Sequence, residues 1–171
     1  MAPMPPEVHY PDLVTPPGWL SGTQGLQVRL VPPRSTLDDA DVAIIISPLV
    51  PRQPLLPPPS QIIEEAIFAE SRQRFEVVSQ KGPTPEKSTT GLVGVAYEVL
   101  GYPRPRWPRE KRNYVMYADS LCYYGISYLA REEVWKQHVE AFWAAARSIR
   151  PFRGKIIAPS APSPIATLYS D

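Results

Sequence analysis

The chain has little cysteine and little histidine: Cys122 is its only thiol, and His9 and His138 are its only imidazoles in 171 residues. A single thiol forms no internal disulfide, and no C-x-x-C, H-x-x-x-H or H-E-x-x-H spacing occurs, so we expect no metal site and no cofactor. Cys122 lies on the apparent core side of an alternating segment. This favours a small buried hydrophobe over a nucleophile with His138 as its base, and we expect no enzyme activity.

The chain also lacks an excess of charge of either sign and a long apolar run. Its 18 basic residues against 17 acidic ones give a net charge of +1, which supplies no general attraction to nucleic acid. No apolar run reaches the roughly 18 residues that a spanning helix needs. The first ten residues have neither the basic nor the apolar region of a secretory signal. We expect a cytoplasmic protein that does not insert into a membrane and whose partner is another protein.

Proline, in contrast, is abundant: the chain has 23, roughly three times the average usage of about 5%. The prolines gather in five clusters that leave the periodic segments free: 3–17, 48–59, 83–85, 103–108 and 151–164. Because proline lacks an amide hydrogen, we expect 48–59 and 82–86 to lie outside regular structure. The pattern predicts three parts: an N-terminal arm at 1–12, a single domain at 13–152 and a flexible tail at 153–171.

Between the proline clusters, apolar residues recur with the periods of strands and helices. Alternation predicts six strands, and spacings of three and four predict two helices. The strands are expected at 26–30, 42–47, 75–80, 92–101, 113–118 and 121–130, and the helices at 60–74 and 132–150. Consecutive strands without long connections favour antiparallel pairing. The predicted fold is therefore α+β: a mainly antiparallel sheet of about six to seven strands packed with two main helices, an α/β/α sandwich.

Two regions are candidates for contact with a partner: a polar, partly aromatic strand face and the cationic segment 104–112. The segment has five cations around Trp107, which suits a phosphate backbone or an acidic protein. A solvated loop is nevertheless favoured, because the balanced net charge gives it no supporting field. Glu98 is interpreted as solvent-facing or paired with Arg29. The predicted partner-binding residues are Gln27, Arg29, Glu98, Tyr123, Ser127, Arg104, Arg106, Trp107 and Arg109.

Several local patterns together resemble a known superfamily: Pro16-Pro17-Gly18-Trp19, Gly91 with Tyr97-Glu98, Tyr128-Leu129-Ala130, and a last helix closing on Arg147-Ser148-Ile149-Arg150-Pro151. Over about residues 8–152, the chain resembles the PsbP-like, DcrB-like α/β/α sandwich superfamily. The resemblance implies a protein without enzyme activity, since members serve as photosystem accessory proteins, a Ran-binding factor, and bacterial chaperones or adaptors for type VI secretion effectors. The chain shows no targeting peptide or lipobox cysteine, which points to the cytoplasmic bacterial adaptors.

The sequence therefore leads to a non-catalytic protein-binding module, an adaptor or chaperone for a secretion-system effector or a similar client. The alternative is a structural subunit of a larger multiprotein assembly whose termini become ordered on neighbours. Two further alternatives are an enzyme that uses Cys122 or Glu98 and a nucleic-acid-binding protein that uses 104–112.

Overall fold

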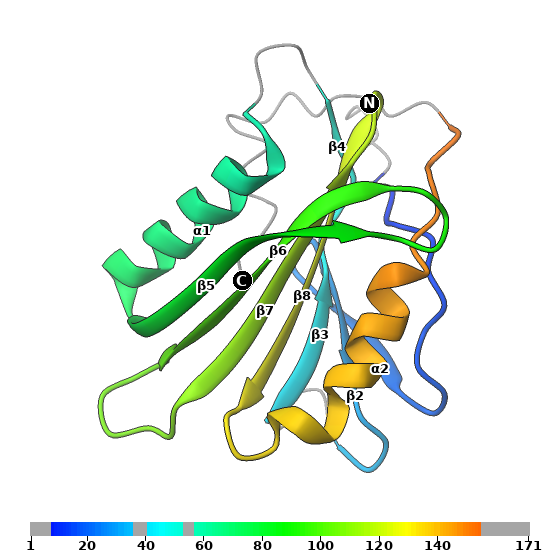
Figure 1. Ribbon diagram of the computed structural model, residues 1–171. Helices are drawn as coiled ribbons and strands as arrows, with labels where there is room; N and C mark the ends of the chain where they lie inside the picture. The colour runs from blue at the N-terminus through cyan, green and yellow to red at the C-terminus, as the bar shows by residue number, and fades with distance from the viewer. Residues whose placement is uncertain (1–7, 36–40, 53–56, 155–171) are drawn as a thin grey trace, which may run out of the picture.

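The computed structural model describes residues 8–35, 41–52 and 57–154. Four strands, a helix, four strands and a second helix follow one another (Figure 1), which confirms the predicted α+β class with two helices. The parts of the predicted arm and tail at 1–7 and 155–171 lie outside the described residues, so the division into arm, domain and tail stays a prediction. The bounds are β1 Leu20–Gln24, β2 Gln27–Val31, β3 Val42–Ile46, β4 Val50–Pro51, α1 Pro59–Gln73, β5 Glu76–Lys87, β6 Val93–Tyr102, β7 Glu110–Ala118, β8 Cys122–Arg131 and α2 Trp135–Arg147.

All neighbouring strands pair antiparallel in one sheet with the order β1-β2-β3-β8-β7-β6-β5. The short β4 pairs with the start of β8, beyond the stretch of β8 that pairs with β3. β3 is buried along its whole length, and its five residues are all apolar. The two edges of the sheet are therefore β1 and β5.

The sheet carries apolar side chains on both faces, and one helix covers part of each face. α1 packs through Ile62, Ile63 and Ile67 on β5, β6 and β7, whereas α2 packs through Phe142 and Ala146 on β8 and β3. We call the two sides the α1 face and the α2 face. The helices lie near opposite edges of the sheet (Figure 1). Within the described chain, no helix covers β2 and β3 on the α1 face.

Both proline-containing segments that were predicted to be irregular include strand residues, and the prediction is wrong at those residues. β5 runs through 82–86: as an edge strand it needs ladder hydrogen bonds on one side only. A register shift between Lys81 and Thr84 accommodates Pro83, and Pro85 lies in register with Val95. Within 48–59, Val50–Pro51 pairs with β8 as β4. Proline thus excludes a central strand but not a strand at the margin of a sheet.

Two other elements also differ from the prediction: β1 is an additional strand, and α2 begins later than expected. β1 was not predicted, because its sequence shows no apolar alternation and four of its five residues are exposed. α2 begins at Trp135, three residues later than expected, because residues 131–134 form a turn in which Val134 donates its N–H to Arg131. The acidic pair Glu132–Glu133 therefore precedes the helix instead of opening it.

The hairpin of β5 and β6 curves across the sheet toward α2 (Figure 1). At its tip, Thr89 donates both its backbone N–H and its hydroxyl to the carbonyl oxygen of Arg147, whose Nε donates to Glu86 at 2.8 Å. Gly94 allows the close approach of β6 to β7, since a Cβ there would lie 2.0 Å from the carbonyl oxygen of Met116. The hairpin therefore closes the α2 face by fastening its tip to the end of α2.

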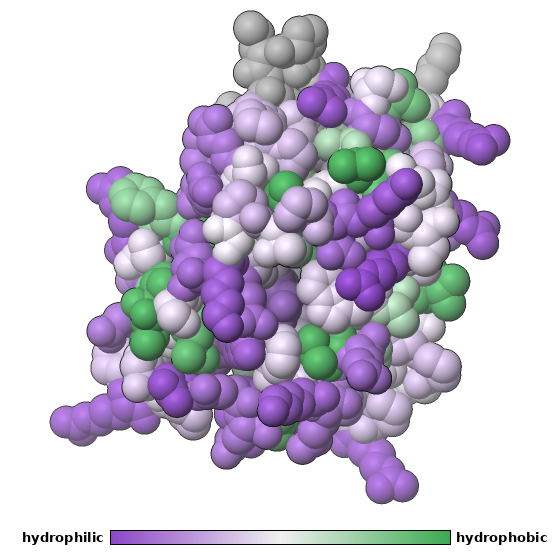
Figure 2. Space-filling model, in the orientation of Figure 1, coloured by the Kyte–Doolittle hydropathy of each residue, from purple (hydrophilic) through white to green (hydrophobic). Residues whose placement is uncertain are grey.

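Hydrophilic side chains cover most of the surface seen in Figure 2, and hydrophobic ones occur there in small separate groups. Neither of the two helices in the described ranges is long and apolar enough to cross a membrane. Large apolar side chains that are exposed lie on different elements, including Leu26, Phe68, Val93, Trp107 and Leu121. Of these, Trp107 borders the hollow that forms the candidate site.

Candidate functional site

The register of the strands determines which side chains share the uncovered part of the α1 face. Paired residues in an antiparallel sheet project their side chains from the same face, so a cross-strand row makes a continuous strip of surface. Two such rows lie side by side here: Arg29–Ile45–Ser127–Tyr114 and Ala43–Leu129–Arg112. Each row begins in the uncovered strands β2 and β3 and ends on β7 at the edge of α1.

Five residues of these rows line the floor of a hollow of about 340 Å³: Arg29, Ala43, Ile45, Leu129 and Arg112. The floor is apolar in its middle, where Ala43, Ile45 and Leu129 lie, and the loop 103–108 between β6 and β7 forms part of the rim. Charged side chains surround this floor. We call the feature the α1-face hollow; its lining is Arg29, Asp41, Ala43, Ile45, Pro103, Arg104, Trp107, Pro108, Glu110, Arg112, Leu129 and Arg131.

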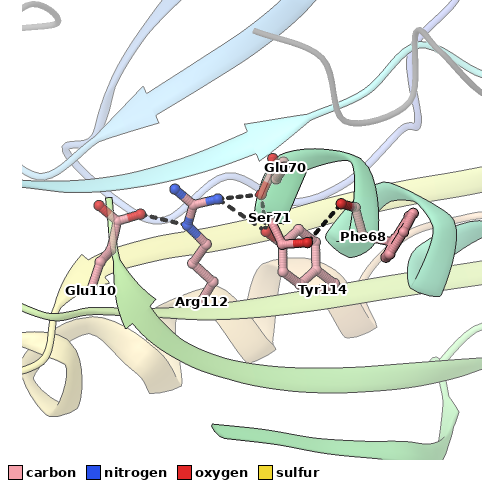
Figure 3. Close-up of polar contacts among 6 residues, drawn as sticks. All are labelled: Phe68, Glu70, Ser71, Glu110, Arg112 and Tyr114. Carbon is pink, nitrogen blue, oxygen red and sulfur yellow. Dashed lines mark hydrogen bonds and ion pairs between the residues drawn. The ribbon is translucent and has the colours of Figure 1, made fainter. Parts of the chain in front are cut away.

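One wall of the hollow is an ion cluster that joins α1 to β7 (Figure 3). Arg112 donates to Glu110 Oε1 at 2.6 Å and to Glu70 of α1, and its guanidinium lies 3.9 Å from the ring centroid of Phe75. The Tyr114 hydroxyl also donates to Glu70, at 2.8 Å. Burial disfavours the charge on Arg112, but Tyr114, Glu110 and Glu70 outweigh it and raise the pKa of the guanidinium. Arg112 therefore keeps its positive charge, and the carboxylates of Glu70 and Glu110 balance it within the fold.

The remaining arginines of the hollow differ in their partners. Arg131 pairs with Asp41 at 3.1 Å and with Glu133 at 3.2 Å. Among the described residues, Arg29 donates only to the amide oxygen of Gln24 at 3.3 Å, and the guanidinium of Arg104 lies 5.1 Å from the ring centroid of Trp107. Neither Arg29 nor Arg104 has an ion pair with any described residue. The hollow thus presents two cations that have no counter-charge among the described residues, beside an apolar floor.

The structure brings five of the predicted partner-binding residues to one place. Gln27, Arg29 and Ser127 lie on the uncovered part of the α1 face, and Gln27 and Ser127 form a deeper, nearly buried extension of the hollow. Arg104 and Trp107 of the cationic loop lie on the rim of the same hollow. The strand face and the loop, two separate predictions from the sequence, are therefore parts of one surface.

The other predicted residues lie elsewhere. Glu98 is on the α2 face and pairs with Lys81 at 3.8 Å and Lys111 at 3.5 Å, so the suggested ion pair with Arg29 does not form. The reason is strand parity: the neighbours of Glu98 in β6, Tyr97 and Val99, face α1.

Tyr123 shares the α1 face but is fully buried, and its hydroxyl donates to the carbonyl oxygen of Pro57 at 2.7 Å. It belongs to the core beneath α1 and offers no surface to a partner. In the cationic loop, Arg109 pairs with Glu132 at 2.7 Å. Neither Arg109 nor Arg106 lines the hollow.

Three features of the candidate site were not predicted from the sequence: the apolar floor, the ion cluster and the charge balance of Arg112. Ala43, Ile45 and Leu129 read as ordinary strand residues, and no local pattern separates them from the rest of the core. Glu70 and Arg112 are 42 positions apart, so their contact depends on how α1 lies across β7. A signal that existed was the alternation of β2 and β8, which placed Arg29 and Ser127 on the face opposite the α2 core.

The thiol of Cys122 is fully buried, and burial raises its pKa to about 11, while a hydrogen bond with Tyr124 acts in the opposite direction. His138 lies elsewhere, with its ring 5.6 Å from that of Trp19. At pH 8 we expect the folded protein to react with dithionitrobenzoate at least about a hundredfold more slowly than the protein unfolded in guanidinium, because the thiolate is scarce and inaccessible. Fast stoichiometric labelling of the folded chain would restore the thiol enzyme as an alternative.

The hollow offers guanidinium groups, an indole ring and an apolar floor, which bind by ion pairing and packing. Across the described residues, no group of three or more histidine, cysteine, aspartate and glutamate side chains is arranged to hold a metal ion. A functional assignment must start from this geometry. No protein-family model matches the chain, and the search of curated proteins finds no match either.

Proposed function

We propose that the protein is a non-catalytic protein-binding module, an adaptor or effector-loading chaperone, which holds a segment of its partner in the α1-face hollow. One observation carries the proposal: an apolar floor, two arginines without an ion pair to any described residue and an exposed tryptophan converge on a single recess. Tryptophan and arginine are the residue types most enriched at the energetic centres of protein interfaces. The resemblance to the PsbP-like, DcrB-like superfamily supports the adaptor role.

The loop at the rim of the hollow is held in place by local contacts. Trp107 donates its backbone N–H to the carbonyl oxygen of Arg104 at 3.2 Å, and the guanidinium of Arg104 lies over the Trp107 ring. Pro103, Pro105 and Pro108 restrict the backbone of the same loop. Side chains that are already ordered lose less conformational entropy on binding, so this loop suits protein recognition.

A pull-down from the native lysate tests the proposal with a matched pair of variants. The double variant Trp107→Ala/Arg104→Ala removes an arginine stacked on an aromatic ring at the hollow. The control Phe68→Ala/Arg72→Ala removes a pair of the same kind, with the guanidinium 5.5 Å from the ring centroid, on the exposed side of α1. We expect the tagged wild type and the control to retain one stoichiometric partner and the hollow variant to lose about tenfold or more of it.

Two results would count against the proposal. Equal recovery of the partner by both double variants would place the interface outside the hollow, and absence of any stoichiometric partner with the wild type would remove the binding role. Loss of the partner only on deletion of 1–7 and 155–171 would favour the structural-subunit alternative.

A further inference from the structure

Only two of the four arginines that line the α1-face hollow have carboxylate partners among the described residues. Four arginines line it, and Arg112 and Arg131 are each paired with two carboxylates. Arg29 and Arg104 have only an amide oxygen and an aromatic ring as partners. A ligand that enters the hollow therefore meets two guanidinium groups that donate to no carboxylate among the described residues.

Burial makes this unused capacity more important. The Nε of Arg29 and the Nε of Arg131 are both shielded from solvent and have no hydrogen-bond acceptor in the described part of the chain. An oxygen anion is the natural acceptor for a guanidinium N–H, and a carboxylate matches its fork geometry with two parallel bonds. Next to Arg29, the floor is apolar: Ala43 and Ile45 are 1% and 7% exposed, and the half-buried Leu129 offers most of the surface on which a hydrophobic side chain could rest.

We infer that the partner segment accepted by the hollow is acidic. Its aspartate or glutamate carboxylates bind the guanidinium groups of Arg29 and Arg104, and an adjacent apolar side chain packs on the floor beside Leu129. This inference rests on the proposed protein-binding function and names the chemistry of the partner. The Trp107 ring holds Arg104 at the rim and covers the bound segment from that side.

The same lining disfavours a nucleic-acid backbone. The other two cations of the lining, Arg112 and Arg131, are already paired with carboxylates. Arg109, which the sequence grouped with the cationic loop, is already paired with Glu132. A nucleic acid is held by a row of free cations along its backbone, whereas the hollow offers two beside an apolar floor.

The inference is tested with a labelled octapeptide in which two glutamates alternate with two leucines between glycine–serine ends. Binding to the full chain is measured by fluorescence anisotropy. We expect the acidic peptide to bind at least about tenfold more tightly than the same peptide with glutamines, and this preference to shrink as salt rises. Arg29→Gln/Arg104→Gln should abolish the preference, whereas the exposed pair Lys87→Gln/Lys136→Gln should leave it unchanged.

Three results would overturn the inference: equal affinity for the acidic and neutral peptides, unchanged preference in Arg29→Gln/Arg104→Gln, or displacement of the acidic peptide by single-stranded oligothymidylate at lower concentration. The pull-down separates this failure from that of the proposed function. A partner that is lost with Trp107→Ala/Arg104→Ala but kept by Arg29→Gln/Arg104→Gln would leave the binding role intact and contradict its acidic chemistry.

Discussion

Replacement of Gly94 by alanine is expected to lower the free energy of unfolding by about 3 kcal/mol, a large effect for one methyl group. The added Cβ would lie 2.0 Å from the carbonyl oxygen and 2.7 Å from the carbonyl carbon of Met116, and 2.7 Å from the Cα of Tyr117. All three are backbone atoms of β7, and they cannot move away without breaking the β6–β7 ladder. No side-chain rotation relieves the contact.

Urea unfolding followed by circular dichroism measures this effect. Val78→Ala in the neighbouring strand β5 is the control, because Val78 is half exposed and loses only its own packing. A Gly94→Ala variant whose stability falls no further than that of Val78→Ala would show that β6 does not approach β7 this closely. The path of the β5–β6 hairpin toward the end of α2, which depends on this close approach, would then be contradicted.

The second large effect is expected for Arg112→Met, at about 3 kcal/mol of lost stability. Methionine retains the apolar stem over Phe75, so the loss reports the charge more than the packing. Without the guanidinium, the Glu70 and Glu110 carboxylates have lost their shared cation at a site where their side chains are only 25% and 21% exposed. Removal of one member of such a cluster leaves the others insufficiently compensated.

The control is Arg109→Met, which breaks the pair with Glu132, whose side chains are 43% and 40% exposed. Solvent screens that pair, so its loss is expected to change stability by about 0.5 kcal/mol or less. A double-mutant cycle of Arg112→Met with Glu70→Gln should give a coupling above about 1 kcal/mol. A cycle without coupling, or equal effects of the two arginine variants, would contradict the structural role of the cluster.

The sequence predicted the fold class because the period of the apolar residues is a local property. In β8, the alternation of residues separates Tyr124, Ile126 and Tyr128 on one face from Tyr123 and Ser127 on the other, as the structure has them. What it did not predict is which of these two faces is covered at each point, because coverage depends on where a helix lies across the sheet. Tyr123 and Ser127 share a face, and α1 covers the first of them only.

The candidate site shows the same division between local and long-range information. Arg29 could be placed on a polar strand face, and Trp107 in a cationic loop, from neighbouring residues alone. Their meeting depends on the antiparallel order β2-β3-β8-β7, which brings the β6–β7 loop to the end of the β2–β3 surface. Of the two alternatives for Glu98, the ion pair with Arg29 was wrong, because alternation in β6 does not say that Tyr97 and Val99 face α1 and that Glu98 faces the other side.

The central claim, that a partner protein occupies the α1-face hollow, is tested most directly by site-specific photo-cross-linking. A photoreactive phenylalanine analogue is placed at position 107 on the rim of the hollow and, as a control, at position 68 on the exposed side of α1. We expect one dominant cross-linked protein from position 107 and none from position 68. An excess of unlabelled wild-type chain should abolish the cross-link from position 107. The same partner cross-linked from position 68 and not from position 107 would contradict the claim.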